Sequence, residues 1–260
     1  MILCPLEPPA ASGSDHGFIS AWDAVEPLQR ASYERCWMIT QPSHAALAGE
    51  IAAKLAGAQV PRLEAELIRA IALHDAGWGM PDAQAVMRSR SVQHSPPCSF
   101  LQVSVAEFLT AWTQSIEVAL STSPAGGYMV SRHFWRLGKH RLNSSRDSAA
   151  DRARLEEFLD SEAGRQKKLT SKQSRSTDEL ETLTDVLQFC DLMSLYLCCG
   201  SLEDVEFPEY FGVKIRATRE PEGLRLSPAL IPAGTRFDVA ALKHPANKSE
   251  SGRKVKFLIV

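Results

Sequence analysis

The feature that most constrains this chain is a small set of ionisable residues at positions where packed helices are normally apolar. These residues are His44, the adjacent pair His74 and Asp75, and Asp191. A buried carboxylate is costly unless a neighbouring group compensates its charge. The sequence therefore predicts that the fold brings these side chains together.

Each of these residues belongs to a segment whose apolar residues recur at helical spacing. In P-S-H-A-A-L-A-G-E-I, His44 shares a face with Leu47 and Ile51. In L-E-A-E-L-I-R-A-I-A-L-H-D, His74 ends an apolar stripe. Asp191 lies near the middle of D-V-L-Q-F-C-D-L-M-S-L-Y-L-C-C, which is apolar nearly all round. We therefore expect three packed helices that share these side chains.

One divalent cation between the three helices would satisfy all four side chains at once. Imidazole and carboxylate donors suit Fe, Mn, Zn or Ni better than a metal that selects thiolates. Adjacent helical residues point about 100° apart, so His74 and Asp75 reach one ion only near a helix end. Gly77, Gly79 and Pro81 follow directly and predict such an end.

Each residue alone also fits a purely structural role. A lone histidine on an apolar helix face is most often a hydrogen-bonded core residue. A lone aspartate could pair with an arginine or cap a neighbouring helix. These roles would require three separate coincidences along one chain, and the adjacent His-Asp step adds a fourth. We therefore favour the metal site.

This pattern resembles the HD superfamily of metal-dependent phosphohydrolase-like proteins, which is named for the adjacent His-Asp pair. The words Q-P-S-H-A-A-L-A-G, A-L-H-D-A-G-W-G and F-C-D-L-M-S-L-Y-L-C look like those of a bacterial branch without assigned function. The resemblance covers about residues 37–202 and implies an all-helical core with the metal held between helices. By position, it makes His44, His74, Asp75 and Asp191 the four ligands.

The sequence departs from the catalytic branches of that superfamily directly after the pair. Those branches often read H-D-x-G-K, in which the Lys can meet a phosphate, and nucleotidase-like members have a Glu three residues after the Asp. Trp78 occupies both places here, and we assign it to substrate contact. Asp75 and Asp82 are the candidate catalytic acids or bases. Asp82, directly after Pro81, fits an exposed turn residue equally well.

Two more histidines bear on the number of ions. Two-metal HD proteins place additional histidine ligands between the pair and the final aspartate, and both His94 and His133 fit that order. His133 faces inward on a helical pattern with Val130 and Phe134, and we include it among the metal ligands. His94 lies in the Pro-broken segment Q-H-S-P-P-C. If both bind, the set would resemble the di-iron oxygenases of the superfamily.

Basic residues accompany His133. Arg132, Arg136 and Lys139 are neighbours on a helix, and arginine offers a bidentate fork to a phosphate. We assign Arg132 and Arg136 to the binding of a small anionic substrate. The alternative is a solvated helix face, the commoner environment of such residues.

Three functions remain open. The first is a metal-dependent phosphohydrolase acting on a phosphoester or nucleotide, in which one ion, or two, would lower the pKa of water and polarise a phosphoryl oxygen. The second is a non-catalytic metal-binding or ligand-binding sensor module, which the Trp78 departure favours. The third is the di-iron oxygenase. The sequence does not decide the substrate, the metal or the oligomeric state.

Composition narrows the class of protein. The chain has 260 residues with 29 basic and 31 acidic side chains, so its formal charge of −2 predicts no broad nucleic-acid surface. No apolar run approaches the roughly 18 residues of a membrane span, and the opening M-I-L-C-P-L-E-P-P lacks the pattern of a signal peptide. Six cysteines occur without a CxxC pair. We therefore expect a cytoplasmic protein.

The order of patterns predicts a mainly α fold: an HD-type helical domain with a small C-terminal antiparallel β appendage. We expect an irregular N-terminal segment at 1–36, a helical metal-binding domain at 37–206, and a β-rich extension at 207–260. Residues 36–41 form a short strand-like run. Within the extension, Y-F-G-V-K-I-R-A-T, L-R-L-S, T-R-F-D-V-A-A-L and R-K-V-K-F-L-I-V are strand candidates.

Overall fold

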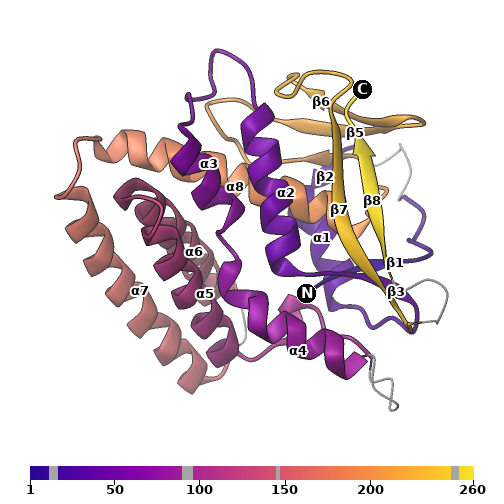
Figure 1. The fold of residues 1–260 in the computed structure, drawn as a ribbon, viewed down its shortest axis with the longest axis horizontal. Coiled ribbons are helices and arrows are strands. Elements are labelled where there is room, and N and C mark those ends of the chain that lie inside the picture. The colour runs from indigo at the N-terminus through magenta and orange to yellow at the C-terminus, as the bar shows by residue number, and fades with distance from the viewer. Residues whose placement is uncertain (12–16, 90–95, 145–146, 247–251) are drawn as a thin grey trace.

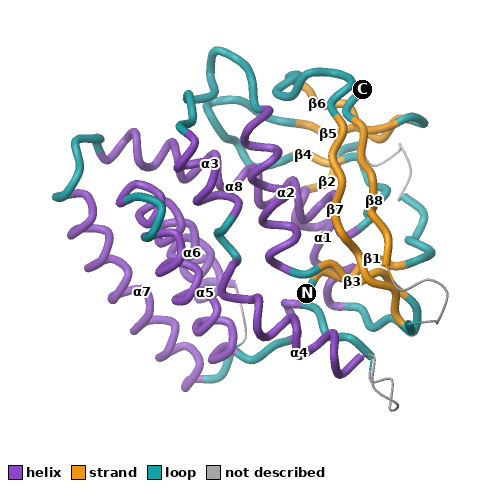
Figure 2. Tube along the Cα trace, in the orientation of Figure 1, coloured by secondary structure: helices purple, strands orange, loops and turns teal. Residues whose placement is uncertain are grey.

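The fold is mainly α-helical, and strands from both ends of the chain flank the helices (Figure 1). The computed structural model describes residues 1–11, 17–89, 96–144, 147–246 and 252–260. Helices α5, α6 and α7 pack together on one side, and the strands lie on the opposite side (Figure 2). Helices α2 and α8 lie between these two groups. Among the described residues, no helix combines the length and apolar character that crossing a membrane requires.

Helices account for most of the segment between residues 41 and 199, as the apolar spacing predicts. Their bounds are α1 (Ala21–Arg30), α2 (Gln41–Lys54), α3 (Ala65–Ala72), α4 (Gly79–Ser89), α5 (Val105–Leu120), α6 (Pro124–Ser144), α7 (Ala149–Thr170) and α8 (Thr177–Cys199). The short 3-10 helices are η2 (Ala76–Trp78) and η3 (Phe100–Gln102).

The strands form two four-stranded sheets. Their bounds are β1 (Ile2–Pro5), β2 (Ile19–Ser20), β3 (Cys36–Ile39), β4 (Val205–Glu206), β5 (Arg216–Glu220), β6 (Gly223–Ser227), β7 (Arg236–His244) and β8 (Gly252–Leu258). One sheet has the order β1-β3-β7-β8 and is antiparallel throughout. The other has the order β2-β4-β5-β6, in which only the β2–β4 pair is parallel. The expected strands after residue 207 and at 36–41 are therefore present.

The prediction of an irregular N-terminal segment is wrong for β1, β2 and α1. Strand β1 is only four residues long, too short to show a period, and it pairs with β3. Helix α1 contains Pro27, which weakens its helical signature, yet Ser20 caps its first turn and five of its residues are buried. Both chain ends thus contribute to the same sheets.

Helix α8 runs through the centre of the molecule. From Val186 to Cys199 nearly every residue is buried, which explains why its sequence is apolar on all sides. It ends at Gly200, whose φ of 73° lies in the left-handed region that glycine adopts at helix C-termini. Asp191 is therefore held in the protein core by a long, well-packed helix.

A close approach between α2 and α3 sets the position of the first two histidines. A Cβ added to Gly49 of α2 would lie 2.5 Å from the Cβ of Ala72, the last residue of α3. Only a glycine permits this backbone separation. The first turn of α2 and the residues after α3 are consequently brought next to each other.

Candidate metal centre

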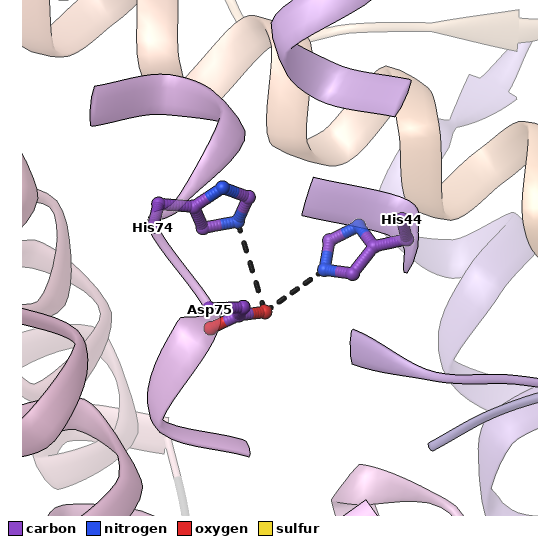
Figure 3. Close-up of side chains that lie close together, drawn as sticks. All are labelled: His44, His74 and Asp75. Carbon is purple, nitrogen blue, oxygen red and sulfur yellow. Dashed lines mark hydrogen bonds and ion pairs between the residues drawn. The ribbon is translucent and has the colours of Figure 1, made fainter. Parts of the chain in front are cut away.

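Three polypeptide segments bring these four ionisable residues together. His44 lies in the first turns of α2, where Thr40 accepts a hydrogen bond from the Ser43 N–H and caps the helix. His74 and Asp75 lie in the turn between α3 and η2 (Figure 3). Asp191 comes from α8. All four residues are buried, as the sequence predicts.

The pair His74 and Asp75 follows a helix rather than ending one. Helix α3 stops at Ala72, and the turn after it lets both side chains point toward His44. Gly79 and Pro81 belong to the first turn of α4, where proline is tolerated. The sequence predicts that this helix ends directly after Asp75, but α3 ends three residues earlier, at Ala72.

The side-chain donors form a tight cluster. The Nε2 of His44 lies 2.8 Å from Oδ2 of Asp75 and 3.8 Å from Oδ1 of Asp191. The Nε2 of His74 lies 3.7 Å from Oδ2 of Asp75 and 3.2 Å from Oδ1 of Asp191. For donors about 2.1 Å from one ion, neighbouring donors are roughly 3.0–3.4 Å apart. The observed separations scatter around that range, so the cluster has the size of a cation site.

Hydrogen bonds on the far side of each ring fix which nitrogen faces the cluster. The Nδ1 of His74 lies 2.8 Å from the carbonyl oxygen of Ile71, so it carries the hydrogen. The Ser194 hydroxyl donates to the Asp191 carbonyl at 2.8 Å and therefore accepts from Nδ1 of His44, also at 2.8 Å. In the neutral rings, each Nε2 then turns a lone pair toward carboxylate oxygens. A proton or a cation must lie between them.

The pKa values of His74 and Asp191 also indicate that the two carboxylates stabilise a positive charge between them. Burial lowers the pKa of His74, but the charges of Asp75 and Asp191 outweigh it and raise the pKa to about 9. Burial raises the pKa of Asp191, but the hydrogen bond and charge of His74 overcome it and lower the pKa to about 2. Two buried carboxylates thus hold a site that favours a cation.

His133 of α6, which the sequence analysis includes among the candidate ligands, lies beside the cluster. Its Nε2 lies 3.6 Å from Oδ2 of Asp191, and its ring centroid is 5.6 Å from that of His74. Burial lowers its pKa to about 4, so the ring is neutral and able to donate a lone pair. Its Nδ1 has no hydrogen-bond partner among the described residues. Asp191 therefore turns one oxygen toward His44 and His74 and the other toward His133.

Two groups of donors result, and either could hold an ion. One contains His44, His74 and Asp75, and the other contains His74, His133 and Asp191, with the donor atoms of each group within 4.8 Å of one another. The histidine side chains are at most 2 % exposed, whereas the carboxylates of Asp75 and Asp191 are 8 % and 11 % exposed. Solvent therefore reaches the cluster from its carboxylate side. His94 lies outside the described residues.

Asp82 has a different environment from the one predicted. It is buried in α4, so it is not an exposed turn residue. Its Oδ1 lies 2.9 Å from the Met1 ammonium group, and its Oδ2 accepts a hydrogen bond from the Gln41 N–H at the start of α2. Both oxygens are thus engaged in holding the helix that carries His44, and neither is grouped with the histidine donors.

Trp78 packs in the core rather than facing a substrate. Its side chain is 2 % exposed, and its ring meets Phe108 edge to face at a centroid distance of 5.2 Å. The turn of η2 directs the indole into the helical layer, because Gly77 before it packs directly on α5. The predicted substrate contact by Trp78 is therefore not seen.

Arg132 and Arg136 are already paired with acids of α8. The Nε of Arg132 lies 2.8 Å from a Glu181 oxygen. The Nη2 and Nη1 of Arg136 lie 2.7 Å from Glu181 and 2.7 Å from Asp185. These contacts neutralise the basic helix face, which leaves the predicted anion contact without free positive charge.

Sequence patterns did not indicate the groups that orient the histidines. Ser194 lies one helical turn after Asp191, a spacing that could have drawn attention to it. The Ile71 carbonyl is a backbone group and leaves no trace in the side-chain pattern. Ser115 of α5 accepts a hydrogen bond from the Gly77 N–H at 3.0 Å, which fixes the chain just after the His-Asp pair.

Comparison with known proteins gives one family. No match was found among curated proteins or among solved structures. Residues 28–240, which include all five clustered residues and most of the chain, match the family described as "Protein of unknown function (DUF3891)". The chain therefore belongs to the DUF3891 family.

Proposed function

We propose that this protein is a metal-dependent phosphohydrolase of the HD type that acts on a phosphoester or nucleotide. The observation that supports the proposal is the convergence of His44, His74, Asp75 and Asp191, with two Nε2 lone pairs turned toward two carboxylates. This set matches the ligand order that the sequence resemblance implies. Transition metals that accept imidazole and carboxylate together, namely Fe, Mn, Zn or Ni, fit the donors.

The chain's own residues have separate roles in this proposal. His44, His74, Asp75 and Asp191 would hold the cation, and Ser194 and the Ile71 carbonyl keep the two rings oriented. A bound divalent cation would supply Lewis acidity, which lowers the pKa of water and polarises a phosphoryl oxygen. The exposed edges of Asp75 and Asp191 mark the side from which a small anionic substrate would enter.

His133 raises the question of a second ion. Because its Nε2 faces the other oxygen of Asp191, that carboxylate could bridge two sites. One ion with His133 as a further ligand and two ions bridged by Asp191 are both compatible with the donor groups. The di-iron oxygenase is a third candidate, which depends on both His133 and His94 being ligands, and His94 lies outside the described residues.

A second candidate function is a non-catalytic metal-binding or ligand-binding sensor module. The observation that favours it is the loss of the expected catalytic surroundings: Trp78 is in the core, Asp82 is tied to α2, and Arg132 and Arg136 are neutralised by acids. With either function, all six cysteines are free, which supports the proposed cytoplasmic location.

A screen separates these functions. Protein loaded separately with Mn, Fe, Co, Ni or Zn is incubated with nucleotides, phosphomonoesters and phosphodiesters, and released phosphate is measured. Hydrolysis should require metal and fall at least a hundredfold in His74→Ala and Asp75→Ala, the order of loss expected for a missing ligand or general acid–base group. Uniform inactivity with every metal would favour the sensor module, and dioxygen uptake by the Fe form would favour the oxygenase.

A further inference from the structure

Asp82 connects two of the chain segments that meet at the donor cluster. It lies in the first turn of α4, which follows η2 directly, and its side chain is buried. Its Oδ2 accepts a hydrogen bond from the N–H of Gln41, the first residue of α2. The carboxylate therefore joins the segment that begins with His74 and Asp75 to the helix that carries His44.

The hydrogen bond from Gln41 completes the N-terminus of α2. The first N–H groups of a helix have no acceptor within the helix itself. In α2, Pro42 has no N–H, and the N–H of Ser43 donates to Oγ1 of Thr40 at 3.2 Å. The Gln41 N–H donates to Asp82, whose negative charge also suits the positive end of the helix dipole. Asp82 is thus a helix cap that a different helix provides.

A second contact between the same two parts of the chain lies on the other side of the cluster. Gly49 of α2 closely approaches Ala72 at the end of α3. This contact comes after His44 in one segment and before Asp75 in the other. The bond to Asp82 comes before His44 and after Asp75. The two contacts thus bracket the 2.8 Å approach of His44 Nε2 to Asp75 Oδ2, and loss of the Asp82 contact would free one end of α2.

Asp82 acts on the donor cluster through α2 and not by direct contact with the donors. Its second oxygen, Oδ1, lies 2.9 Å from the Met1 ammonium group. Neither oxygen belongs to the two groups of donors that could hold an ion. A metal site binds its ion tightly when the ligands already have the required separations before the ion arrives. A residue that fixes a helix carrying a ligand therefore contributes to metal affinity without touching the ion.

We propose that Asp82 is a positioning residue of the metal centre, which sets the separation of His44 and Asp75 by capping α2 from α4. This inference rests on the proposed function, because it assumes that the donor cluster holds a cation. It gives Asp82 an indirect role in place of the acid or base role that its position in the sequence suggests.

The test is a titration of the full-length protein with Co²⁺, followed by the visible absorption of the bound ion. It is carried out at a temperature at which circular dichroism shows each variant to be folded. Asp82→Ala removes the acceptor of the Gln41 N–H and should bind Co²⁺ about 10–100-fold more weakly, the loss typical of groups that orient metal ligands. Asp82→Asn keeps one acceptor oxygen, so its affinity should fall between those of the wild type and Asp82→Ala. If Asp82→Ala does not fold, Asp82→Leu, which fills the space left by the carboxylate, takes its place.

Glu179→Ala is the matched control. An oxygen of Glu179 accepts a hydrogen bond from the Ser176 N–H at 2.7 Å, at the start of the helix α8 that carries Asp191. This carboxylate also caps a helix with a proposed ligand, but the bond stays at the start of that helix and joins no second segment of the cluster. Glu179→Ala should therefore lower the melting temperature and bind Co²⁺ as the wild type does.

The outcomes separate this inference from the function on which it rests. Wild-type Co²⁺ affinity in the variant that lacks the Asp82 carboxylate would overturn the role of Asp82 and leave the metal centre in place. An equal loss of affinity in Glu179→Ala would show a general effect of helix capping and would also count against Asp82. An Asp82→Asn affinity no better than that of Asp82→Ala would exclude the hydrogen bond to α2 as the source of the effect. A wild type that does not bind Co²⁺ would overturn both proposals.

Discussion

The Nε2 of His44 lies 2.8 Å from Oδ2 of Asp75, although the two residues come from different helical segments. Because Ser194 occupies the other nitrogen of the ring, the neutral His44 turns a lone pair toward a carboxylate oxygen. Such a contact is stable only with a proton or a metal ion between the two atoms. The backbone contact of Gly49 with Ala72 keeps the segments at this separation.

The first prediction concerns Gly77, the residue two positions after Asp75. A Cβ at this position would lie 2.1 Å from the Ala111 carbonyl oxygen and 2.9 Å from the Ser115 nitrogen, both of which are backbone atoms. Gly77→Ala should therefore destabilise the protein by about 1–3 kcal/mol or more, as overpacking does. Thermal unfolding should show a melting temperature lower by several degrees, at roughly 2–4 °C per kcal/mol.

Gly164→Ala is the matched control for Gly77→Ala. Gly164 is exposed on α7, and a Cβ added there would meet no atom within 4 Å. Because alanine is the better helix former, this variant should be more stable than the wild type by about 0.5–1 kcal/mol. A Gly77→Ala variant as stable as Gly164→Ala would contradict the tight packing of the turn on α5.

The second prediction separates two proposed roles of Asp191, the binding of a metal ion and the charge pairing with the buried histidines. Asp191→Ala removes a proposed ligand and leaves the facing histidines without their charge partner, so we expect metal loss and destabilisation of about 3 kcal/mol. Asp191→Leu also loses the metal, but its apolar side chain suits the core helix and should make it more stable than Asp191→Ala. Melting temperatures measured with chelator, and then with added metal, compare the two variants. Equal stability of both would argue against this account.

The helical part of the fold could be predicted from the sequence because apolar spacing is clear over long helices such as α5 and α8. In strands β5 to β8, apolar and polar residues alternate along the sequence, which is the pattern of a strand with one buried face. Strand β1 and helix α1 could not be predicted, because one is too short for a period and the other contains Pro27. The pairing of β1 with β3, and of β3 with β7, joins distant segments and has no local signature.

The clustering of four ionisable residues could be predicted from the sequence for a simple physical reason. Ionisable residues in apolar helical patterns require partners when they are buried. The sequence alone therefore predicts that the side chains of His44, His74, Asp75 and Asp191 lie close together. The surroundings could not be predicted in this way. Arg132 and Arg136 look like free donors until the packing of α6 on α8 shows the acids that pair with them.

The third prediction uses His133 and an exposed histidine of the same helix. If His133 takes part in metal binding, His133→Ala should reduce metal affinity or the number of bound ions, by about 10–100-fold in affinity. His140→Ala changes the same residue type on the exposed face of α6 and should leave metal binding unchanged. Isothermal titration of the metal-free protein measures both. Identical titrations for the two variants would remove His133 from the site.

The fourth prediction is a pH dependence at the α6–α8 contact. Burial raises the pKa of Glu181, but hydrogen bonds from Arg136 and Tyr128 and the charge of Arg132 outweigh it and lower the pKa. Because the folded-state pKa is depressed, this carboxylate stabilises the protein above the ordinary pKa of 4.5, and the contribution is lost as pH falls through the lowered value.

Glu181→Gln tests this contact. At pH 7 the variant should be less stable than the wild type by about 1–3 kcal/mol, because two arginines lose a charged partner. The difference should shrink as the pH falls below the ordinary pKa of the glutamate. Urea unfolding at several pH values measures it, and a difference that stays constant down to acid pH would rule out the ionised carboxylate as its source.

Metal analysis of protein purified without chelator, combined with anomalous scattering from its crystals, tests the central claim most directly. We predict at least one transition-metal ion per chain, with an anomalous peak about 2.0–2.3 Å from donor atoms of His44, His74, Asp75 and Asp191. A metal-free protein whose melting temperature responds neither to chelator nor to added metal would contradict the account, as would an anomalous peak held by other residues.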